Sequence, residues 1–211
     1  MFNFLIYRLS VFFDVFFYFC SLYYLRISVE DIKEIVKGCI KGNRAMQSRL
    51  YKMFASQMYA LCLRYTRNDF DAQDVLQEGF VKIFNNLKDF QWKGSLEGWM
   101  KRIFIRLALD RFRNKIQILS VDEIPEKDNF SEKDSNAIDQ MSAKEILYIV
   151  QELPDQYRLV FNLYVLEGYS HNEISQILNI GVSTSRSNLV RAKNILKEKI
   201  VYNAHWIDKA I

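Results

Sequence analysis

Cationic and aromatic side chains gather between residues 92 and 113 of this 211-residue chain. Arg102, Arg106 and Arg113 are separated by four and seven residues, steps that return to the same side of a helix. Trp92 and Lys93 stand a short distance before them. Cations bind phosphates and rings stack on unpaired bases, so this combination predicts binding of single-stranded nucleic acid. A solvated helix face beside core aromatics is the alternative interpretation.

Two tryptophans of this stretch are interpreted differently. Trp99 falls on an apolar helical stripe, so a place in the core is favoured. Trp92 stands beside Lys93, where core packing and ligand contact fit equally well.

A second basic face lies near the end of the chain. Leu189, Ala192 and Leu196 recur at helical spacing and are expected to face inward. The opposite side then presents Ser183, Ser187, Val190 and Asn194, flanked by Arg186 and Arg191. Arginine can bind guanine through two hydrogen bonds and valine can contact a thymine methyl group, so this face suits the major groove of DNA. A solvated surface helix is the alternative, and the two helices predicted before it favour DNA.

The sequence contains no pattern typical of catalysis or of a bound cofactor. It has no Gly-rich phosphate loop and no nucleophile elbow. Cys20, Cys39 and Cys62 form no Cys-x-x-Cys pair, and His171 and His205 are isolated, so no metal site is predicted. His171 follows Ser170 at an expected helix start. A net charge of +4 permits a nucleic-acid partner without requiring one.

The elements that position these residues are predicted to be helices throughout. Half of the residues are hydrophobic, and there are only 7 Gly and 2 Pro. Because hairpins and strand connections need such turn residues, the composition favours an all-α fold. Apolar residues recur at helical spacing in two blocks, which predict two small helical domains at residues 28–115 and 142–202. Between them, residues 116–141 are rich in Asp and Glu and predict an acidic, flexible linker.

In the first block, we expect four helices. The third is predicted over residues 72–87, with these residues inward: Val75, Leu76, Phe80, Ile83, Phe84 and Leu87. Ser95 is predicted to cap the fourth helix, whose inward stripe is Trp99, Ile103 and Leu107.

In the second block, an apolar stripe stops at Pro154: Ile146, Ile149, Val150 and Leu153. A helix is expected over residues 156–166, followed by two more over about 170–178 and 183–201. The tight join that contains Gly181 is typical of a helix-turn-helix.

The segment at residues 1–27 is apolar and aromatic but is interrupted by Arg8 and Asp14. Three interpretations of residues 2–25 are open: a translated upstream region from a misassigned start, a weak membrane anchor, and a helix that packs on the body. The first is favoured because the organised pattern begins near Ser28.

These segments together resemble the extracytoplasmic-function (ECF) group of the sigma-70 family of RNA polymerase sigma factors. The resemblance covers residues 36–115 and 143–200. Its most specific stretches are DAQDVLQEGFVKIF at 71–84, GSLEGWMKRI at 94–103, LALD at 107–110, LPDQYR at 153–158, EISQIL at 173–178 and TSRSNLVRAK at 184–193.

The resemblance implies three groups of binding residues. The helix that binds core RNA polymerase would use Asp71, Asp74, Gln77, Glu78 and Phe80, an acidic and amide face suited to a basic partner. The −10 element of promoter DNA would meet Phe90, Trp92, Lys93, Arg102, Arg106 and Arg113, with the loop at 88–95 capturing a flipped base. The −35 element would meet Thr184, Arg186, Ser187, Val190 and Arg191 in the major groove.

The sequence departs from the family pattern at the helix-turn-helix. Gly181 stands where a capping Ser is more common and Ser183 where a Gly is, which predicts a recognition helix that starts later, with Ser183 as its cap. Asn188 stands where a basic residue is common, which predicts one fewer phosphate contact. Residues 1–27 have no counterpart in the family.

The leading hypothesis is therefore a cytoplasmic sigma factor without enzymatic activity, cofactor or small-molecule substrate. Its expected partners are core RNA polymerase, promoter DNA and an anti-sigma factor. The alternatives are a stand-alone helix-turn-helix regulator that works without polymerase, and a membrane-tethered regulator anchored by residues 2–25. The first block argues against a plain regulator, which has no use for the helix at 71–84.

Overall fold

The computed structural model describes residues 29–118 and 143–207. Within these ranges the regular elements are all helices and no strand occurs, which confirms the all-α prediction. The chain divides into two compact units, and the boundary falls between Asp110 and Arg111. None of the helices in these ranges combines the length and apolar character needed to cross a membrane. The segment at 1–27 and nearly all of the predicted linker lie outside the described residues.

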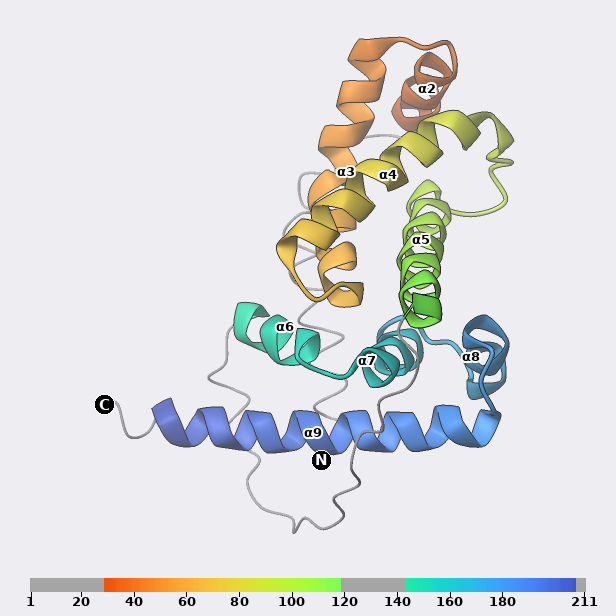
Figure 1. Ribbon diagram of the computed structural model, residues 1–211. Coiled ribbons are helices and arrows are strands. Elements are labelled where there is room, and N and C mark those ends of the chain that lie inside the picture. Colours follow the sequence, from red (N-terminus) through yellow and green to blue (C-terminus); the bar gives the residue numbers. More distant parts are fainter. Residues whose placement is uncertain (1–28, 119–142, 208–211) are drawn as a thin grey trace. The chain divides into compact units, whose positions relative to one another are not determined.

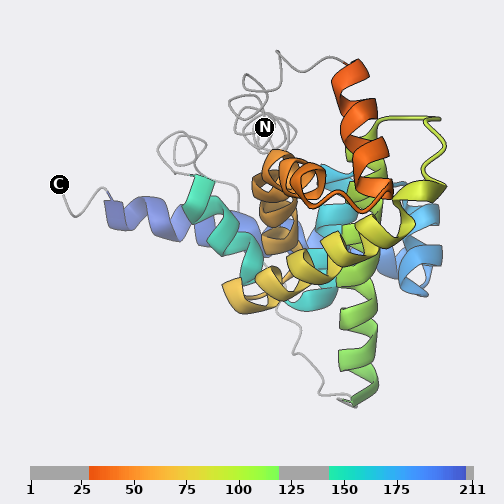
Figure 2. The ribbon, with the colours of Figure 1, turned by 90° about the horizontal axis from the view of Figure 1, so that it is seen from above.

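The first unit is a bundle of consecutive helices. Its elements are α2 (Val29–Ile40), α3 (Arg44–Tyr65), α4 (Asp69–Asn86), the 3-10 turn η1 (Leu87–Asp89) and α5 (Leu96–Ile118), of which residues 96–110 belong to this unit. Both α2 and α4 pack against α3, and α4 crosses α3 in the views of Figures 1 and 2. Since α5 continues to Ile118, the helix extends three residues beyond the predicted end of the first block at 115.

Side-chain caps fix the helix starts of this unit. Asn68 precedes α4, and its Oδ1 accepts a hydrogen bond of 2.8 Å from the Asp71 backbone N–H. Ser95 precedes α5, and its Oγ accepts from the Gly98 N–H at 3.0 Å, which confirms the predicted cap. Each cap satisfies a backbone donor that the first helical turn leaves without an intrahelical partner.

Helices α4 and α5 approach each other closely at Gly79. A Cβ atom at Gly79 of α4 would lie 2.0 Å from Cε1 of Phe104 on α5, so only glycine permits this approach. Phe104 is 1% exposed. Its ring also contacts Phe80 edge-on, with ring centroids 5.6 Å apart.

The predicted inward faces are right for α4 and partly wrong for α5. On α4 and η1 the predicted residues are buried, except that Phe84 is half-buried. On α5, Leu107 is buried as predicted, but Trp99 and Ile103 are only half-buried. Their C-terminal neighbours, Met100 and Phe104, fill the core instead. The sequence pattern placed the stripe one position too early because Trp99 and Ile103 are themselves apolar.

The second unit is organised around one long helix. Its elements are α6 (Ala143–Gln151), α7 (Asp155–Phe161), the π-helical turn η3 (Asn162–Leu166), α8 (His171–Leu178) and α9 (Val182–Ile207). Helices α6, α7 and α8 all pack on α9, which runs along the three of them in Figure 1. The residues of the two predicted stripes are buried as expected: Ile146, Ile149, Val150 and Leu153, and Leu189, Ala192 and Leu196.

A buried arginine holds the corner between α6 and α7. Arg158 is 3% exposed, and its Nη1 donates to the carbonyl oxygens of Gln151 at 3.0 Å and Leu153 at 3.1 Å. Its guanidinium also pairs with Asp155. The carbonyls at the end of α6 thus gain donors that the helix cannot supply.

The predicted helix-turn-helix is present, with one correction. Ser170 and Glu173 form a capping box at the start of α8, and Asn179 ends that helix in the left-handed conformation, at φ 54°. Glu173 accepts hydrogen bonds from Ser170, which lower the pKa of its carboxyl. The recognition helix α9 begins at Val182, and the Ser185 N–H bonds to the Gly181 carbonyl at 2.9 Å. The later start with Ser183 as cap was therefore wrong: Ser183 already lies in the first turn.

Candidate nucleic-acid and polymerase interfaces

Helix α9 presents a continuous exposed face. The residues predicted for the −35 element are all exposed: Thr184, Arg186, Ser187, Val190 and Arg191. Val190 keeps 57% of its surface exposed, so it offers an apolar contact on this face. Because the opposite side is buried against α7 and α8, this face is held in a fixed orientation within the second unit.

A cluster missed by the sequence analysis joins α8 to the start of α9. His171 Nδ1 lies 2.9 Å from Oγ of Ser185, which is fully buried. The imidazole also stacks on the Tyr164 ring, with centroids 4.5 Å apart. Burial, together with the positive charges of Arg186 and Lys193, lowers the pKa of His171 below its usual 6.5. The ring is therefore neutral at pH 7 and serves to orient the two helices.

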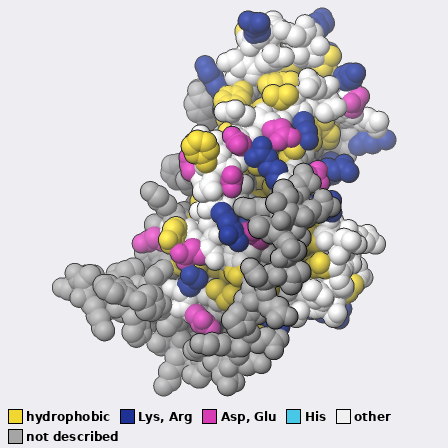
Figure 3. Space-filling model, viewed as in Figure 1, with side chains coloured by type: hydrophobic (Ala, Val, Ile, Leu, Met, Phe, Trp, Pro, Cys, Tyr) yellow, Lys and Arg dark blue, Asp and Glu magenta, His cyan; other side chains and the backbone are white. Residues whose placement is uncertain are grey.

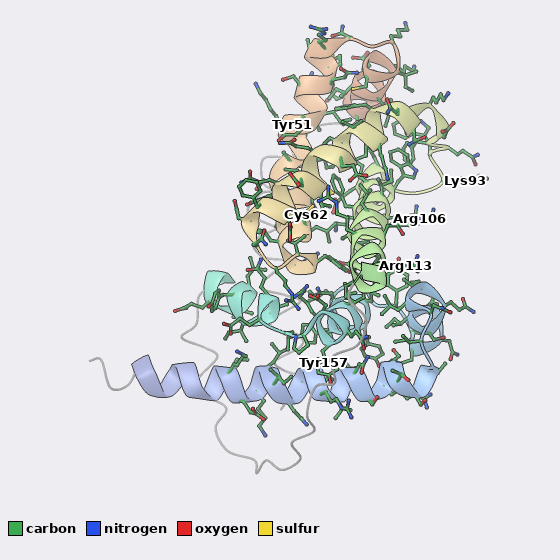
Figure 4. The ribbon with its side chains drawn as sticks, in the orientation of Figure 1. Tyr51, Cys62, Lys93, Arg106, Arg113 and Tyr157 are labelled. Atoms are coloured by element: carbon green, nitrogen blue, oxygen red, sulfur yellow. The ribbon has the colours of Figure 1, made fainter. Side chains whose placement is uncertain are left out.

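A tyrosine from α7 contacts one of the predicted base-reading residues. Arg191 Nη1 donates to the Tyr157 hydroxyl at 3.4 Å, and Figure 4 shows Tyr157 between α7 and α9. The two residues are 34 positions apart, so no local pattern connects them. This contact limits the directions that the guanidinium can take.

The expectation for Asn188 is not met. Its side chain is only 4% exposed and its Nδ2 has no hydrogen-bond partner within the described residues. A side chain on the buried face of α9 does not project from the DNA-facing side. The absence of a basic residue at this position therefore removes no contact from the exposed face.

The basic stripe of the fourth helix is exposed as predicted. Arg102, Arg106 and Arg113 lie on the outside of α5, within about 40° of one another around the helix axis. Figure 4 shows Lys93 on the preceding loop and Arg106 and Arg113 on α5. Arg113 stands beyond the boundary of the first unit, on the same helix.

The loop before α5 places an exposed indole on a buried ring. Trp92 is 41% exposed and has a φ of 58°, a left-handed conformation that residues with a Cβ rarely adopt. Its ring packs on Phe90 at 4.8 Å, and Phe90 also contacts Trp99 at 5.4 Å. Because Phe90 is 8% exposed, it supports Trp92 from beneath and offers little surface for the DNA contact that was predicted for it.

The residues predicted for polymerase binding divide into a surface set and one core residue. Asp74 and Gln77 are exposed, while Asp71 and Glu78 are partly exposed. Phe80 is 3% exposed and packs between Phe104 and Tyr51, with its centroid 4.6 Å from that of Tyr51. A direct polymerase contact by Phe80 does not fit this structure, because the ring is enclosed by its own unit.

No metal-binding group is present in the part of the chain that the structure describes: no three His, Cys, Asp or Glu side chains gather there. Cys39 and Cys62 are buried. Burial raises the pKa of Cys39 to about 11, so this thiol stays protonated at neutral pH.

Comparison with known proteins assigns the two blocks to one family. Residues 50–116 match Sigma-70 region 2 and residues 139–196 match Sigma-70, region 4. Together these matches cover more than half of the chain. The protein therefore belongs to the sigma-70 family of RNA polymerase sigma factors.

Individual relatives indicate which group of the sigma-70 family the chain resembles. The chain is 28% identical to the ECF RNA polymerase sigma factor SigW of Bacillus subtilis over 80% of its own length and 96% of that protein. It is also 28% identical to the ECF RNA polymerase sigma-E factor of Escherichia coli K12, over 79% of its own length and 92% of that protein. The protein is an ECF-type RNA polymerase sigma factor.

A solved structure is similar at lower identity. It is the sigma factor RpoE in complex with the anti-sigma factor NepR from Bartonella quintana, 14% identical, with a TM-score of 0.46. The match covers 74% of this chain and 96% of that one.

Proposed function

We propose that this protein directs core RNA polymerase to promoters through three separate surfaces. They are the outer face of α9, the Trp92 loop with the basic stripe of α5, and the acidic face of α4. Domain boundaries at 28–115 and 142–202 fit this division. The observation that carries the proposal is that both predicted DNA faces present exposed basic side chains on packed helices, Arg102 and Arg106 on α5 and Arg186 and Arg191 on α9.

The outer face of α9 is proposed to bind the −35 element as duplex DNA. A single regular helix fits the major groove, and the exposed Arg186, Val190 and Arg191 supply groups that can contact base edges. Ser187 and Thr184 add short polar groups between them. The His171–Ser185 contact sets the angle at which this helix leaves the turn.

The Trp92 loop and the α5 stripe are proposed to bind the opened −10 element. An indole that rests on Phe90 can stack on an unpaired base, and each such stack contributes about 1–3 kcal/mol. Arg102 and Arg106 would hold the phosphates of the same strand. Capture of a flipped base offsets part of the cost of unstacking it from the duplex.

The face of α4 is proposed to bind core polymerase. Asp71, Asp74 and Glu78 give it a negative charge, and Gln77 adds a donor and an acceptor. Phe80 stabilises this helix from within rather than contacting the partner.

We further propose an anti-sigma factor as a regulatory partner. The sigma factor RpoE of Bartonella quintana has been solved in complex with such a partner, the anti-sigma factor NepR. The protein would act in the cytoplasm, where its polymerase is found, and would act by binding rather than by catalysis. No cofactor or metal enters this function.

A run-off transcription assay tests the proposal. Core polymerase from the same organism is incubated with the DNA upstream of this protein's own gene, with and without the protein. A protein-dependent transcript is expected, with Asp74→Arg as the variant that abolishes it and Gln176→Ala, exposed on α8, as the control. DNA binding without co-purifying polymerase and without transcript would favour a stand-alone helix-turn-helix regulator instead.

A further inference from the structure

A hydrogen bond between α3 and α5 holds the helical turn that follows the Trp92 loop (residues 90–95). Gln57 Nε2 on α3 donates to Glu97 Oε1 in the first turn of α5 at 2.5 Å, across 40 positions of sequence. Both side chains belong to half-buried residues. Among the described helices, α3 packs closely on α2 and α4, whereas no comparably close packing joins it to α5. The bond therefore attaches α5 to α3 at a point that close packing of their backbones does not secure.

The turn that Gln57 attaches also carries part of the support for Trp92. Trp99 contacts the Phe90 ring from this end of α5, with centroids 5.4 Å apart, and Trp92 packs on the same ring at 4.8 Å. Ser95 ends the loop and caps the turn by accepting from the Gly98 N–H. A displacement of the first turn of α5 would therefore move the end of the loop and one of the two rings that hold Phe90 in place.

Glu97 also binds a cation of its own helix. The same Oε1 atom lies 2.7 Å from Lys101 Nζ, one helical turn further along α5. Acidic and basic side chains are interspersed on the visible face of the first unit in Figure 3, so the cations that can reach DNA depend on their acidic neighbours. The Lys101 side chain is 29% exposed, whereas Arg102 and Arg106 belong to the exposed residues. Glu97 thus draws together one side chain from α3 and one from α5.

We propose that Gln57 and Glu97 are positioning residues of the Trp92 loop. The bond between them fixes the first turn of α5 on α3, and this keeps Phe90 and Trp99 in the arrangement that presents the indole to an unpaired base. The inference rests on the proposed binding of the opened −10 element by this loop. It adds the contact that holds the loop in one conformation, although neither Gln57 nor Glu97 touches the DNA.

Loss of the bond should reduce the gain from base stacking and spare the binding of phosphates. A stacked base contributes about 5- to 150-fold in affinity, and the gain requires the ring and the base to meet face to face. The relevant quantity is a ratio: the affinity for a forked fragment with intact unpaired −10 bases, divided by that for the same fragment with those bases removed. Gln57→Ala should lower this ratio by about threefold or more. The affinity for the fragment without bases should stay the same, because Arg102 and Arg106 are unaltered.

The test measures both affinities by fluorescence anisotropy, with the full chain assembled on core polymerase. Gln57→Glu places a second carboxylate against Glu97, so the ratio should fall. The double variant Gln57→Glu with Glu97→Gln exchanges the two partners, and its amide can donate to the carboxylate in the opposite direction. This double variant should regain the wild-type ratio, a rescue that a general loss of stability would not allow.

Glu97→Gln alone separates the two contacts of Glu97. Its amide oxygen can still accept from Gln57, so the ratio should stay at the wild-type value. The variant releases Lys101 from its ion pair, and the ammonium group can then bind a phosphate. Both fragments should therefore be bound more tightly at low salt, and the gain should disappear at high salt.

Glu152→Ala is the matched control for Gln57→Ala. Glu152 likewise accepts from a side chain on another helix, Lys199 at 2.6 Å and 47 positions away, but it lies in the second unit. Each variant removes one side-chain contact between two helices, so both should lower the melting temperature by similar small amounts. Only Gln57→Ala should change the ratio.

Three outcomes would overturn the inference. A wild-type ratio in Gln57→Ala would show that the loop keeps its conformation without the bond. A double variant that binds no better than Gln57→Glu alone would exclude the bond as the cause of the loss. If the wild-type chain on polymerase binds both fragments equally, the Trp92 loop is no base receptor, and the proposed −10 function fails together with the inference.

Discussion

The two candidate DNA surfaces are built on opposite principles. Helix α9 offers a regular row of side chains whose backbone is entirely helical, and its inner face is fixed by α6, α7 and α8. The Trp92 loop offers one indole from a backbone at φ 58°, supported by a single buried ring. Duplex DNA repeats regularly, so a regular helix can follow its groove, whereas an extruded base needs a local and irregular receptor. This contrast fits the proposed division of labour, in which α9 binds intact duplex and the Trp92 loop binds opened strands.

The largest expected effect breaks the packing of the unit that carries the Trp92 loop. Gly79→Val should unfold the first unit at much lower denaturant, because the new side chain would overlap the buried Phe104 ring. Overpacking of this kind costs about 1–3 kcal/mol, occasionally more. Urea denaturation followed by circular dichroism measures it. Gly94→Ala is the matched control, since a Cβ there meets nothing within 4 Å; equal midpoints for the two variants would contradict the interlocked core.

On the duplex side, Arg191→Ala should weaken binding to the −35 sequence by about 1–3 kcal/mol if this arginine reads a base. The loss should be confined to the specific site, because a base contact discriminates between sequences and a phosphate contact does not. Competition between the promoter fragment and a scrambled duplex measures it, with Gln176→Ala as control. An unchanged preference would remove the base-reading role.

On the single-strand side, Trp92→Ala should weaken binding to a forked fragment with an unpaired −10 strand by about 1–3 kcal/mol, since one base loses its stacking partner. Binding to the −35 duplex should stay the same. Trp92→Gly distinguishes the role of the indole ring from that of the backbone conformation. Glycine adopts the positive φ without strain, but it lacks the ring, so the loss of affinity for the forked fragment should be the same. If either variant holds the forked fragment as tightly as the wild type, the indole is not the receptor.

A smaller effect follows from the titration of His171. Its folded pKa lies below the usual 6.5, so the unfolded chain takes up the proton first as the pH falls. The stability that neutral His171 contributes is therefore complete above about pH 7 and is lost as the pH falls through the folded pKa. His171→Phe keeps an aromatic ring against Tyr164 without a titrating group. Its urea midpoint should fall less than that of the wild type between about pH 7.5 and 5.5, and identical declines would rule out this linkage.

The smallest effect sharpens the description of α9. Tyr157→Phe removes only the hydroxyl that Arg191 contacts, at a cost of about 0.5–1 kcal/mol in −35 binding. The double variant with Arg191→Ala should bind no worse than Arg191→Ala alone. If the losses of the two single variants add up in the double variant, Tyr157 acts independently of Arg191.

Periodicity predicted most of the helices and their inward faces. The burial predicted for the stripe that ends at Leu153 and for the one that ends at Leu196 was confirmed. The buried face of a helix can be recognised from the spacing of apolar residues within a short segment of sequence. The sequence pattern also placed Phe80 inward; only the family resemblance suggested a partner contact, and its burial supports the pattern.

The features that were missed depend on contacts between elements. No spacing rule joins Tyr157 to Arg191 or His171 to Ser185. The positive φ of Trp92 is equally hidden, because the usual signal for that conformation is Gly or Asn. The close approach of Phe104 to Gly79 could be predicted only from the relative placement of α4 and α5. A glycine inside a helix was, however, already a reason to expect a close contact there.

Because the helices of the second unit pack on α9, the position of α9 in the chain also determines the order in which the two units can fold during synthesis. Lys199 of α9 pairs with Glu152, 47 positions earlier, and every preceding helix of this unit rests on α9. A growing chain can close the α2–α5 bundle while α9 is still to be made, because α2 to α5 all precede α9 in the chain. The part proposed to bind polymerase is thus assembled first, and the −35 reader takes shape only when the last described helix emerges.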